Sequence, residues 1–276
     1  MGKSIPKVNT MYALVTGASS GIGLRYAEAL ARDYHYDLLL VSNQEKELSE
    51  VADRLHTTYG VQTRWLYMNL AQADAAERIY SFCQENDLSV EVLINNAGML
   101  IFEPFIVASP AKIQTITMLH VVALTNLCRL FAPDMCERGK GYILNMSSMS
   151  AWMAMPGIQC YNATKGYVLN FSRALWYELR GRGVHVLAMT PGSTDTGMLP
   201  FPPTFAKLLR AVGITMSPEK LVRKALKALF RSKRKRYMPG AWNKIIVPII
   251  NHLPDWLVIA IMRRVPLFDP CFADKK

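Results

Sequence analysis

The chain has 276 residues and 51% of them are hydrophobic, which is enough for one large α/β domain with a buried core and excludes a disordered protein. Its formal net charge of +11 is unevenly distributed. Residues 1–204 hold 16 Lys and Arg against 17 Asp and Glu, a net of −1, whereas residues 205–276 hold 16 against 4, a net of +12, so the C-terminal quarter suits an anionic surface.

The five cysteines are scattered and form no Cys-x-x-Cys pair, which argues against a disulfide framework and against a metal site. A reducing compartment is the simpler interpretation. Residues 1–10 lack the apolar core of a signal peptide, and no uninterrupted apolar run reaches the roughly 18 residues of an ordinary transmembrane helix. We therefore expect a cytoplasmic protein.

Short apolar runs alternate with longer amphipathic segments along most of the chain. The runs predict strands at 12–16, 38–41, 63–68, 90–94, 142–146 and 184–189, and the segments between them predict helices near 22–33, 44–58, 72–86, 110–136 and 160–181. Strands that are apolar throughout are buried on both faces. Strict alternation of strand and helix predicts an α/β fold with a doubly wound parallel sheet, which binds ligands at the carboxyl ends of its strands.

The pattern changes after Gly192. Residues 193–216 are rich in Pro, Phe, Leu and Met without a clear period, which predicts an apolar lid that includes Met198, Leu199, Phe201, Phe205, Leu208 and Leu209. Ser217 is a favourable N-cap and Pro218 suits the first helical position, so a helix should begin there. We expect one domain over 1–200, the lid over 193–216, and a basic, apolar helical extension over 217–276.

A glycine-rich loop follows the first predicted strand, at residues 16–23 with the sequence TGASSGIG. Glycines at a strand-to-helix turn let the backbone approach a pyrophosphate, and the next helix directs its N-terminal amides at that anion. The alternative is a turn that simply requires glycines. The position after the first strand of an α/β chain favours the nucleotide site.

The pattern TGxxxGIG resembles the classical short-chain dehydrogenase/reductase family, and four further motifs continue the resemblance over about residues 10–200. They are Asn95-Asn96-Ala97-Gly98, Ser148 thirteen residues before Tyr161, Tyr161-x-x-x-Lys165, and Pro191-Gly192 followed by Thr196. The resemblance implies a Rossmann fold and reversible hydride transfer between a nicotinamide and a carbonyl or secondary alcohol. The cofactor-binding residues that it implies are Gly17, Ser19, Ser20, Gly21, Ile22, Gly23, Asn43, Asn69, Leu70, Asn96, Ala97, Gly98, Tyr161, Lys165, Pro191, Gly192, Thr194 and Thr196.

Tyr161 is the expected catalytic acid/base, because carbonyl reduction needs a proton donor for the developing alkoxide. The ordinary pKa of tyrosine is about 10, and a nearby ammonium lowers it. Lys165 stands four residues further along a helix and therefore on the same face. Ser148 would hydrogen-bond the substrate oxygen, and the family resemblance gives Lys165 a second role on the nicotinamide ribose. Ser147 is adjacent, but the spacing to Tyr161 favours Ser148.

His120 is a departure from the family, which usually has an asparagine there that positions a water beside the lysine. Counting forward from Gly98 or back from Pro133 reaches the same residue. An imidazole can also donate and accept hydrogen bonds, so His120 is a candidate catalytic residue that maintains the proton relay. The alternative is that His120 only packs in its helix.

The choice between NADP(H) and NAD(H) depends on the end of the second strand. A carboxylate there would bind the ribose of NAD(H) and repel a 2′-phosphate. Ser42, Asn43 and Gln44 carry none, which favours NADP(H). NAD(H) stays open, because Asn43 stands where the family often has an arginine. Lys46 or Arg25 would then have to contact the phosphate.

Two classes of function remain at this stage. The intact Ser148, Tyr161 and Lys165 favour an oxidoreductase, and the lid residues favour an apolar ketone such as a fatty 3-oxoacyl, ketosphingoid or steroid-like substrate. The second class is a nucleotide-binding regulator or scaffold of the same fold with little turnover. We also expect a homo-oligomer.

The C-terminal extension is expected to dock on a membrane surface without spanning it. Lys220, Arg223, Lys224 and Lys227 recur at helical spacing, and residues 231–236 add a basic run before the Trp-bearing apolar segment 241–262. Interleaved Ile, Leu, Val and Trp suit lipid better than bases, so no nucleic-acid partner is expected. The alternative is that 241–262 closes the substrate pocket or a subunit interface.

Overall fold

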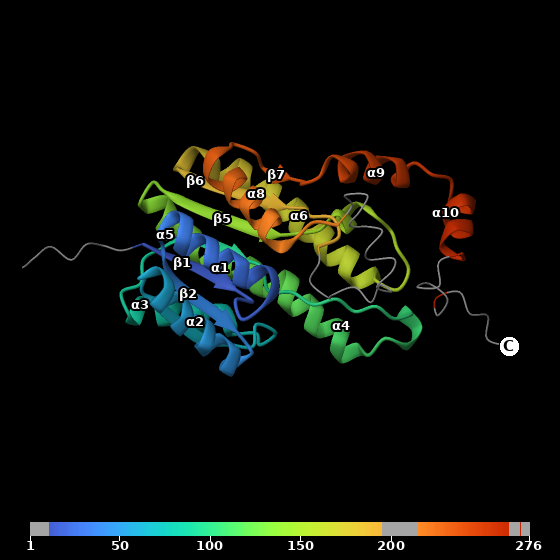
Figure 1. Cartoon of the computed structure of the whole chain (residues 1–276). Coiled ribbons are helices and arrows are strands. Elements are labelled where there is room, and N and C mark those ends of the chain that lie inside the picture. The colour runs from blue at the N-terminus through green and yellow to red at the C-terminus, as the bar shows by residue number, and fades with distance from the viewer. Residues whose placement is uncertain (1–10, 195–214, 265–270, 272–276) are drawn as a thin grey trace, which may run out of the picture.

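The computed structural model of the chain describes residues 11–194, 215–264 and 271. Its centre is a seven-stranded sheet in the order β3-β2-β1-β4-β5-β6-β7, in which all paired strands run parallel (Figure 1). The strands are β1 Tyr12–Thr16, β2 Asp37–Ser42, β3 Thr63–Tyr67, β4 Val90–Asn95, β5 Gly141–Met146, β6 Val184–Met189 and β7 Arg236–Tyr237. The predicted doubly wound α/β fold is confirmed.

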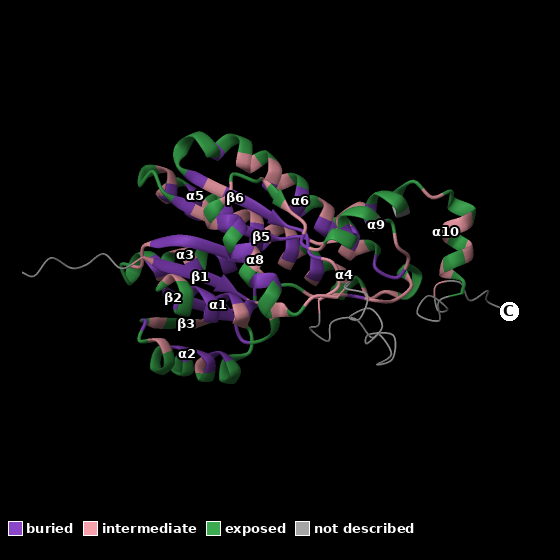
Figure 2. Cartoon of the chain, turned by 45° about the horizontal axis from the view of Figure 1, so that its top comes forward, coloured by how far each residue is buried: buried purple, intermediate pink, exposed green. Residues whose placement is uncertain are grey.

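Helices cover both faces of the sheet. One face packs against α1 Gly21–Tyr34, α2 Glu45–Tyr59 and α8 Pro218–Arg231, and the other against α3 Ala75–Glu85, α5 Leu124–Glu137 and α6 Gln159–Leu179. Each interface is a separate buried cluster, and between them lie the buried strands β1, β2, β4, β5 and β6 (Figure 2). The remaining helices are α4 Pro110–Thr117, α9 Ala241–Asn251, α10 Asp255–Met262, the short 3₁₀ turns Phe105–Val107, Met149–Trp152 and Arg180–Arg182, and a π-helical turn Met118–Ala123.

The six predicted strands are found to within one residue at either end, but burial on both faces fails for β3. Trp65 is 38% exposed and Tyr67 is 51% exposed. The reason is position, because β3 forms the sheet edge opposite β7 and has only β2 as a neighbour. Edge strands leave one side open to solvent.

The helix predicted near 110–136 is divided into α4, the π-helical turn and α5. By length and composition alone the run Pro110–Glu137 could cross a membrane, yet 44% of its most apolar stretch is buried in the protein. Its residues Leu124, Leu127, Cys128 and Phe131 belong to the core cluster under the sheet. Core packing therefore accounts for its apolar character.

The sheet continues beyond residue 200 into the segment that was expected to form a separate extension. Ser217 Oγ accepts from the Lys220 backbone N–H at 3.4 Å, which confirms the predicted cap. Leu221, Leu226 and Leu229 of α8 are fully buried against the sheet, and β7 then pairs with β6. The apolar side of α8 is thus not available to lipid, whereas α9 and α10 extend past the carboxyl ends of the strands (Figure 1).

Candidate active site

The loop between β1 and α1 requires its glycines. Gly17 has a φ of 66°, and a Cβ on it would lie 3.0 Å from the Ala97 Cα atom. A Cβ on Gly23 would lie 2.0 Å from the Gly17 carbonyl oxygen. Gly21 has a φ of 55° and open space beside it, and the Ser20 side chain makes no capping hydrogen bond. The glycines thus allow a tight turn and close backbone packing at the start of α1, where the N-terminal amides of the helix are suited to bind a pyrophosphate.

Thr16 ties this loop to the end of β4. Its Oγ1 accepts from the backbone N–H groups of Asn96 and Ala97, both at 3.0 Å, while the Asn96 side chain donates to the Thr16 carbonyl oxygen at 3.0 Å. Two strand ends are thereby locked together. The predicted residues Gly17, Asn96 and Ala97 are brought into one place, at the carboxyl edge of the sheet.

The residues expected near the adenosine lie beside the end of β2. Ser19 Oγ is 2.8 Å from Ser42 Oγ and donates to Gln44 Oε1 at 2.7 Å, so Ser42 is buried and engaged. Asn43 is exposed, as is Asn69, whereas Leu70 is buried. Arg25 is held by Glu28 at 2.7 Å and by Glu219 at 2.9 Å. Arg25 would have to leave these ion pairs to contact a 2′-phosphate.

Tyr161 and Lys165 lie on one face of α6, as their spacing predicts. The Lys165 ammonium is 5.5 Å from the centroid of the Tyr161 ring and donates to the Met146 carbonyl oxygen at 2.8 Å. Burial lowers the pKa of Lys165 to about 7. Burial raises the pKa of Tyr161, and a hydrogen bond with Ser148 opposes that change. Burial therefore moves the two pKa values apart, and the lowering of the Tyr161 pKa that was expected from Lys165 is not found.

The structure shows that the adjacent Ser147 and Ser148 have different partners. Ser147 Oγ donates to the Lys165 carbonyl oxygen at 2.7 Å and is buried, so it fixes the α6 backbone. Ser148 follows the end of β5, is half-buried, and hydrogen-bonds with Tyr161. Ser148 is therefore the one that can meet a substrate oxygen, as the spacing predicts.

His120 stands in the π-helical turn, with its ring 5.7 Å from that of Tyr161. The Met99 backbone N–H donates to His120 Nε2 at 3.1 Å, so the proton lies on Nδ1, which is 2.9 Å from Thr164 Oγ1. Thr164 in turn donates to the Tyr161 carbonyl oxygen at 2.9 Å. Burial and then the nearby Lys165 hold the pKa of His120 well below its usual value. This geometry favours a neutral imidazole that positions α6, and the relay role stays a hypothesis.

Substitution of His120 distinguishes these roles. His120→Leu leaves the Met99 N–H without a partner, which should destabilise the fold by roughly 1–3 kcal/mol. In the unfolded chain His120 takes up a proton below pH 6.5 whereas the native protein does not, so wild type should lose stability as the pH falls from 7 to 5. Denaturant unfolding should show that His120→Asn loses less stability than wild type over the same pH range. A relay role requires instead that His120→Leu lowers kcat at equal folded fraction.

Sequence and structure comparisons agree with this geometry. The family model for short chain dehydrogenase matches residues 11–201. The chain belongs to the short-chain dehydrogenase family. The human very-long-chain 3-oxoacyl-CoA reductase is 30% identical over 259 residues, covering 92% of this chain and 79% of the relative. A short-chain dehydrogenase from Sphingobium yanoikuyae, solved in complex with NADPH, is 30% identical with a TM-score of 0.74, covering 92% of this chain and 96% of that one.

Not every relative in the short-chain dehydrogenase family is an active enzyme. The human inactive hydroxysteroid dehydrogenase-like protein 1 is 32% identical over 251 residues, covering 89% of this chain and 73% of the relative. Family membership alone therefore does not establish turnover. In this chain the structure brings the predicted residues Ser148, Tyr161 and Lys165 together.

The family segment Pro191-Gly192 lies at the end of β6. The Pro191 carbonyl oxygen accepts from the Met149 N–H at 2.9 Å, and Thr194 forms a parallel bridge with Met216, which joins the two ends of the predicted lid. Thr196 and the six lid residues lie outside the described residues. One neighbour was not expected: Asn243 of α9 occupies the space beside Gly192, with its Nδ2 only 2.3 Å from where a Cβ would be. Nothing in its sequence context indicates this contact.

Proposed function

We propose that the chain is an NADP(H)-dependent reductase of an apolar ketone, with Tyr161 as the proton donor. The observation that carries this proposal is that Tyr161, Lys165 and Ser148 lie together at the carboxyl edge of the sheet, the same edge that carries the glycine loop after β1. The human relative named for reducing very-long-chain 3-oxoacyl-CoA supports a fatty acyl substrate and a place in lipid metabolism.

Each catalytic side chain has one task in this reaction. The bound nicotinamide supplies the hydride. Ser148 hydrogen-bonds the carbonyl oxygen and helps to polarise it, and the Tyr161 hydroxyl gives that oxygen its proton. Lys165 stabilises the resulting phenolate when it is protonated, and its pKa of about 7 lets it change charge near neutral pH. The Lys165 ammonium donates a hydrogen bond to the Met146 carbonyl oxygen, which keeps it in place.

The function is tested by following NADPH oxidation with a panel of 3-oxoacyl thioesters, ketosphingoid bases and oxosteroids. We expect turnover with at least one long apolar ketone and less with its short-chain analogue. Tight NADPH binding without turnover on any ketone would favour the nucleotide-binding regulator instead.

NADP(H) should bind more tightly than NAD(H), because no carboxylate follows β2. Ser42 is a poor position for a test, since an aspartate there would be buried against Ser19. The exposed Asn43 is better. Asn43→Asp should weaken NADPH binding by charge repulsion and leave NADH binding similar or tighter, as measured by direct titration. Asn86→Asp is a control at an exposed site between α3 and β4, away from the carboxyl edge of the sheet, and a wild type that prefers NADH would contradict the assignment.

We further propose that α9 and α10 rest on a membrane surface. Their exposed apolar side chains include Trp242 at 54%, Trp256 at 70%, Ile245 and Ile249. Lys244, Arg263 and Arg264 add positive charge in the same helices or directly after them. Tryptophan beside cations is typical of helices that lie at the lipid interface. The alternative occupant of this surface is a second copy of the chain, which would account for the expected homo-oligomer.

Vesicle co-sedimentation distinguishes these two. Deleting 231–276 would remove β7 from the sheet, so point substitutions are preferable. The pair Trp242→Ser and Trp256→Ser should reduce binding to anionic vesicles at least about tenfold, whereas Trp65→Ser on the opposite sheet edge should not. Binding should weaken with salt. The surface is a subunit interface if the protein does not bind anionic vesicles at low salt and forms a dimer by light scattering. The double substitution Trp242→Ser and Trp256→Ser should then disrupt that dimer.

A further inference from the structure

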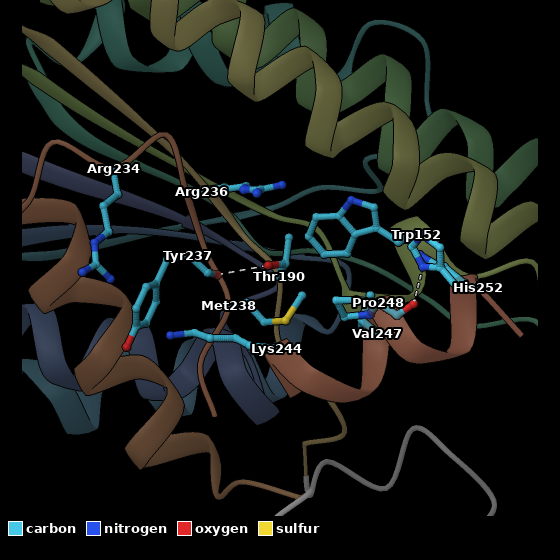
Figure 3. Close-up of a pocket in the computed structure, with 11 residues that line it drawn as sticks. Trp152, Thr190, Arg234, Arg236, Tyr237, Met238, Lys244, Val247, Pro248 and His252 are labelled. Atoms are coloured by element: carbon cyan, nitrogen blue, oxygen red, sulfur yellow. Dashed lines mark hydrogen bonds between the residues drawn. The ribbon is translucent and has the colours of Figure 1, made fainter. Parts of the chain in front are cut away.

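A hollow of about 450 Å³ lies between the end of β7 and α9, apart from the glycine loop and on the far side of β6 from it (Figure 3). We call it the β7–α9 pocket. Its walls come from the turn after Ser148, from the ends of β6 and β7, and from one side of α9. The volume is within the range of small-molecule sites. The reductase chemistry described above assigns no role to this pocket.

The charged side chains that line the pocket are all basic. They are Arg234, Arg236 and Lys244, the imidazole of His252 lies beside them, and no carboxylate lines the pocket. None of these four takes part in the ion pairs found among the described residues. His252 Nδ1 is 2.7 Å from the Pro248 carbonyl oxygen, which leaves Nε2 for another partner. Three unneutralised cations and an imidazole around one hollow favour an anionic ligand.

Only some residues of the basic run at 231–236 line the pocket. Arg234 and Arg236 line it, whereas Lys235 between them lies against Tyr177 and Trp176. Lys235 therefore provides a matched control from the same basic run.

Aromatic rings occupy the two ends of the pocket. Tyr237 lies at one end with the Arg234 guanidinium 5.6 Å from its ring, and Trp152 lies at the other with Arg236 at 5.7 Å (Figure 3). Met238, Val247 and Pro248 form an apolar wall between them. Guanidinium groups held over aromatic rings are oriented for planar recognition of phosphate oxygens. An inorganic ion would use the basic groups but leave the rings and the apolar wall without a partner.

We propose that the β7–α9 pocket binds the phosphate group of an organic phosphate ester, with the organic part of the ligand against Trp152, Tyr237 and the apolar wall. Two sources share this chemistry. One is the nucleotide part of an acyl thioester, whose base would stack on an aromatic ring. The other is a phospholipid headgroup reached from α9. The proposal depends neither on turnover nor on membrane docking.

Calorimetric titration of the full chain tests the proposal, both without NADPH and with one equivalent of it, because NADPH fills the nucleotide site but is itself a phosphate ester that would compete for the pocket. The probes are coenzyme A and a short-chain phosphatidylglycerol below its micellar concentration. We expect one of them to bind and inorganic phosphate to compete with it. Arg236→Gln and Lys244→Gln should each weaken binding about tenfold, the size of one charge-assisted hydrogen bond, whereas Lys235→Gln should not.

The outcomes distinguish the two ligand sources from each other, and some of them would overturn the proposal. Binding of coenzyme A alone assigns the pocket to a nucleotide-bearing ligand, and binding of phosphatidylglycerol alone assigns it to a headgroup. Equal affinities in wild type, Arg236→Gln and Lys244→Gln would overturn the proposal, as would binding that phosphate does not displace. If neither probe binds to a folded protein, the pocket is not a phosphate-ester site. Thermal unfolding of each variant verifies that it is folded.

Discussion

Tyr161→Phe should reduce kcat by at least about 10²-fold while NADPH binding stays nearly intact. The change keeps the ring that packs 5.7 Å from His120 and removes only the hydroxyl that interacts with Ser148. The carbonyl oxygen of the substrate then has no proton donor in a suitable position. Single-turnover kinetics with NADPH and the best ketone, together with fluorescence titration of NADPH, separate the chemical step from binding.

Tyr167→Phe is the matched control for this experiment. Tyr167 lies on the same helix, is 39% exposed, and has its hydroxyl 2.9 Å from Thr125 Oγ1. Tyr167→Phe therefore removes the same hydroxyl group at a position away from the reacting centre. We expect near-normal turnover from it. Near-normal turnover from Tyr161→Phe as well would remove the basis for the proposed mechanism.

Lys165→Met should abolish most turnover and at the same time stabilise the protein without cofactor. The side chain is buried, its ammonium has one carbonyl partner, and burial lowers its pKa to about 7. Between pH 7 and 10 the unfolded chain holds a proton on Lys165 that the native protein lacks, so wild-type stability rises with pH over this range. The advantage of Lys165→Met should therefore shrink as the pH rises, by up to about 1.4 kcal/mol per pH unit.

Denaturant unfolding at several pH values measures this effect, and NADPH titration measures the accompanying loss of cofactor affinity. Lys112→Met provides the comparison, because Lys112 is exposed and pairs only with Glu103 at 3.4 Å among the described residues. It should change neither the pH dependence nor turnover. A Lys165→Met variant with wild-type kcat, or with a pH-independent stability difference, would contradict the role assigned to Lys165.

The sequence predicted the sheet and the catalytic residues because both have local signals. A buried parallel strand is a continuous apolar run, and the motif spacings are fixed by turns and by helix periodicity. Tyr161 and Lys165 share a face for that reason alone. Ser148 could be separated from Ser147 by spacing, and the structure adds the cause, since Ser147 is turned to the backbone of α6.

Other features depend on contacts between distant segments and have no local signal. The π-helical turn at His120 continues the same apolar pattern as its neighbours, so the helix 110–136 was predicted as uninterrupted. The two residues of β7, Arg236 and Tyr237, lie at the end of a basic run whose sequence does not predict a strand. The amphipathic pattern of α8 is the same whether its apolar side meets a sheet or lipid, and only the structure shows Leu221 and Leu229 in the core.

The contact between Asn243 and Gly192 limits how this protein can be shortened. Asn243 is 4% exposed and fills the space where a side chain on Gly192 would stand. Removing α9 would open a hole directly behind the segment that follows β6. A minimal catalytic unit therefore has to extend to about residue 251, although the family match ends at 201. Transplanting the C-terminal helices onto another short-chain dehydrogenase would in turn require a glycine at the position of Gly192.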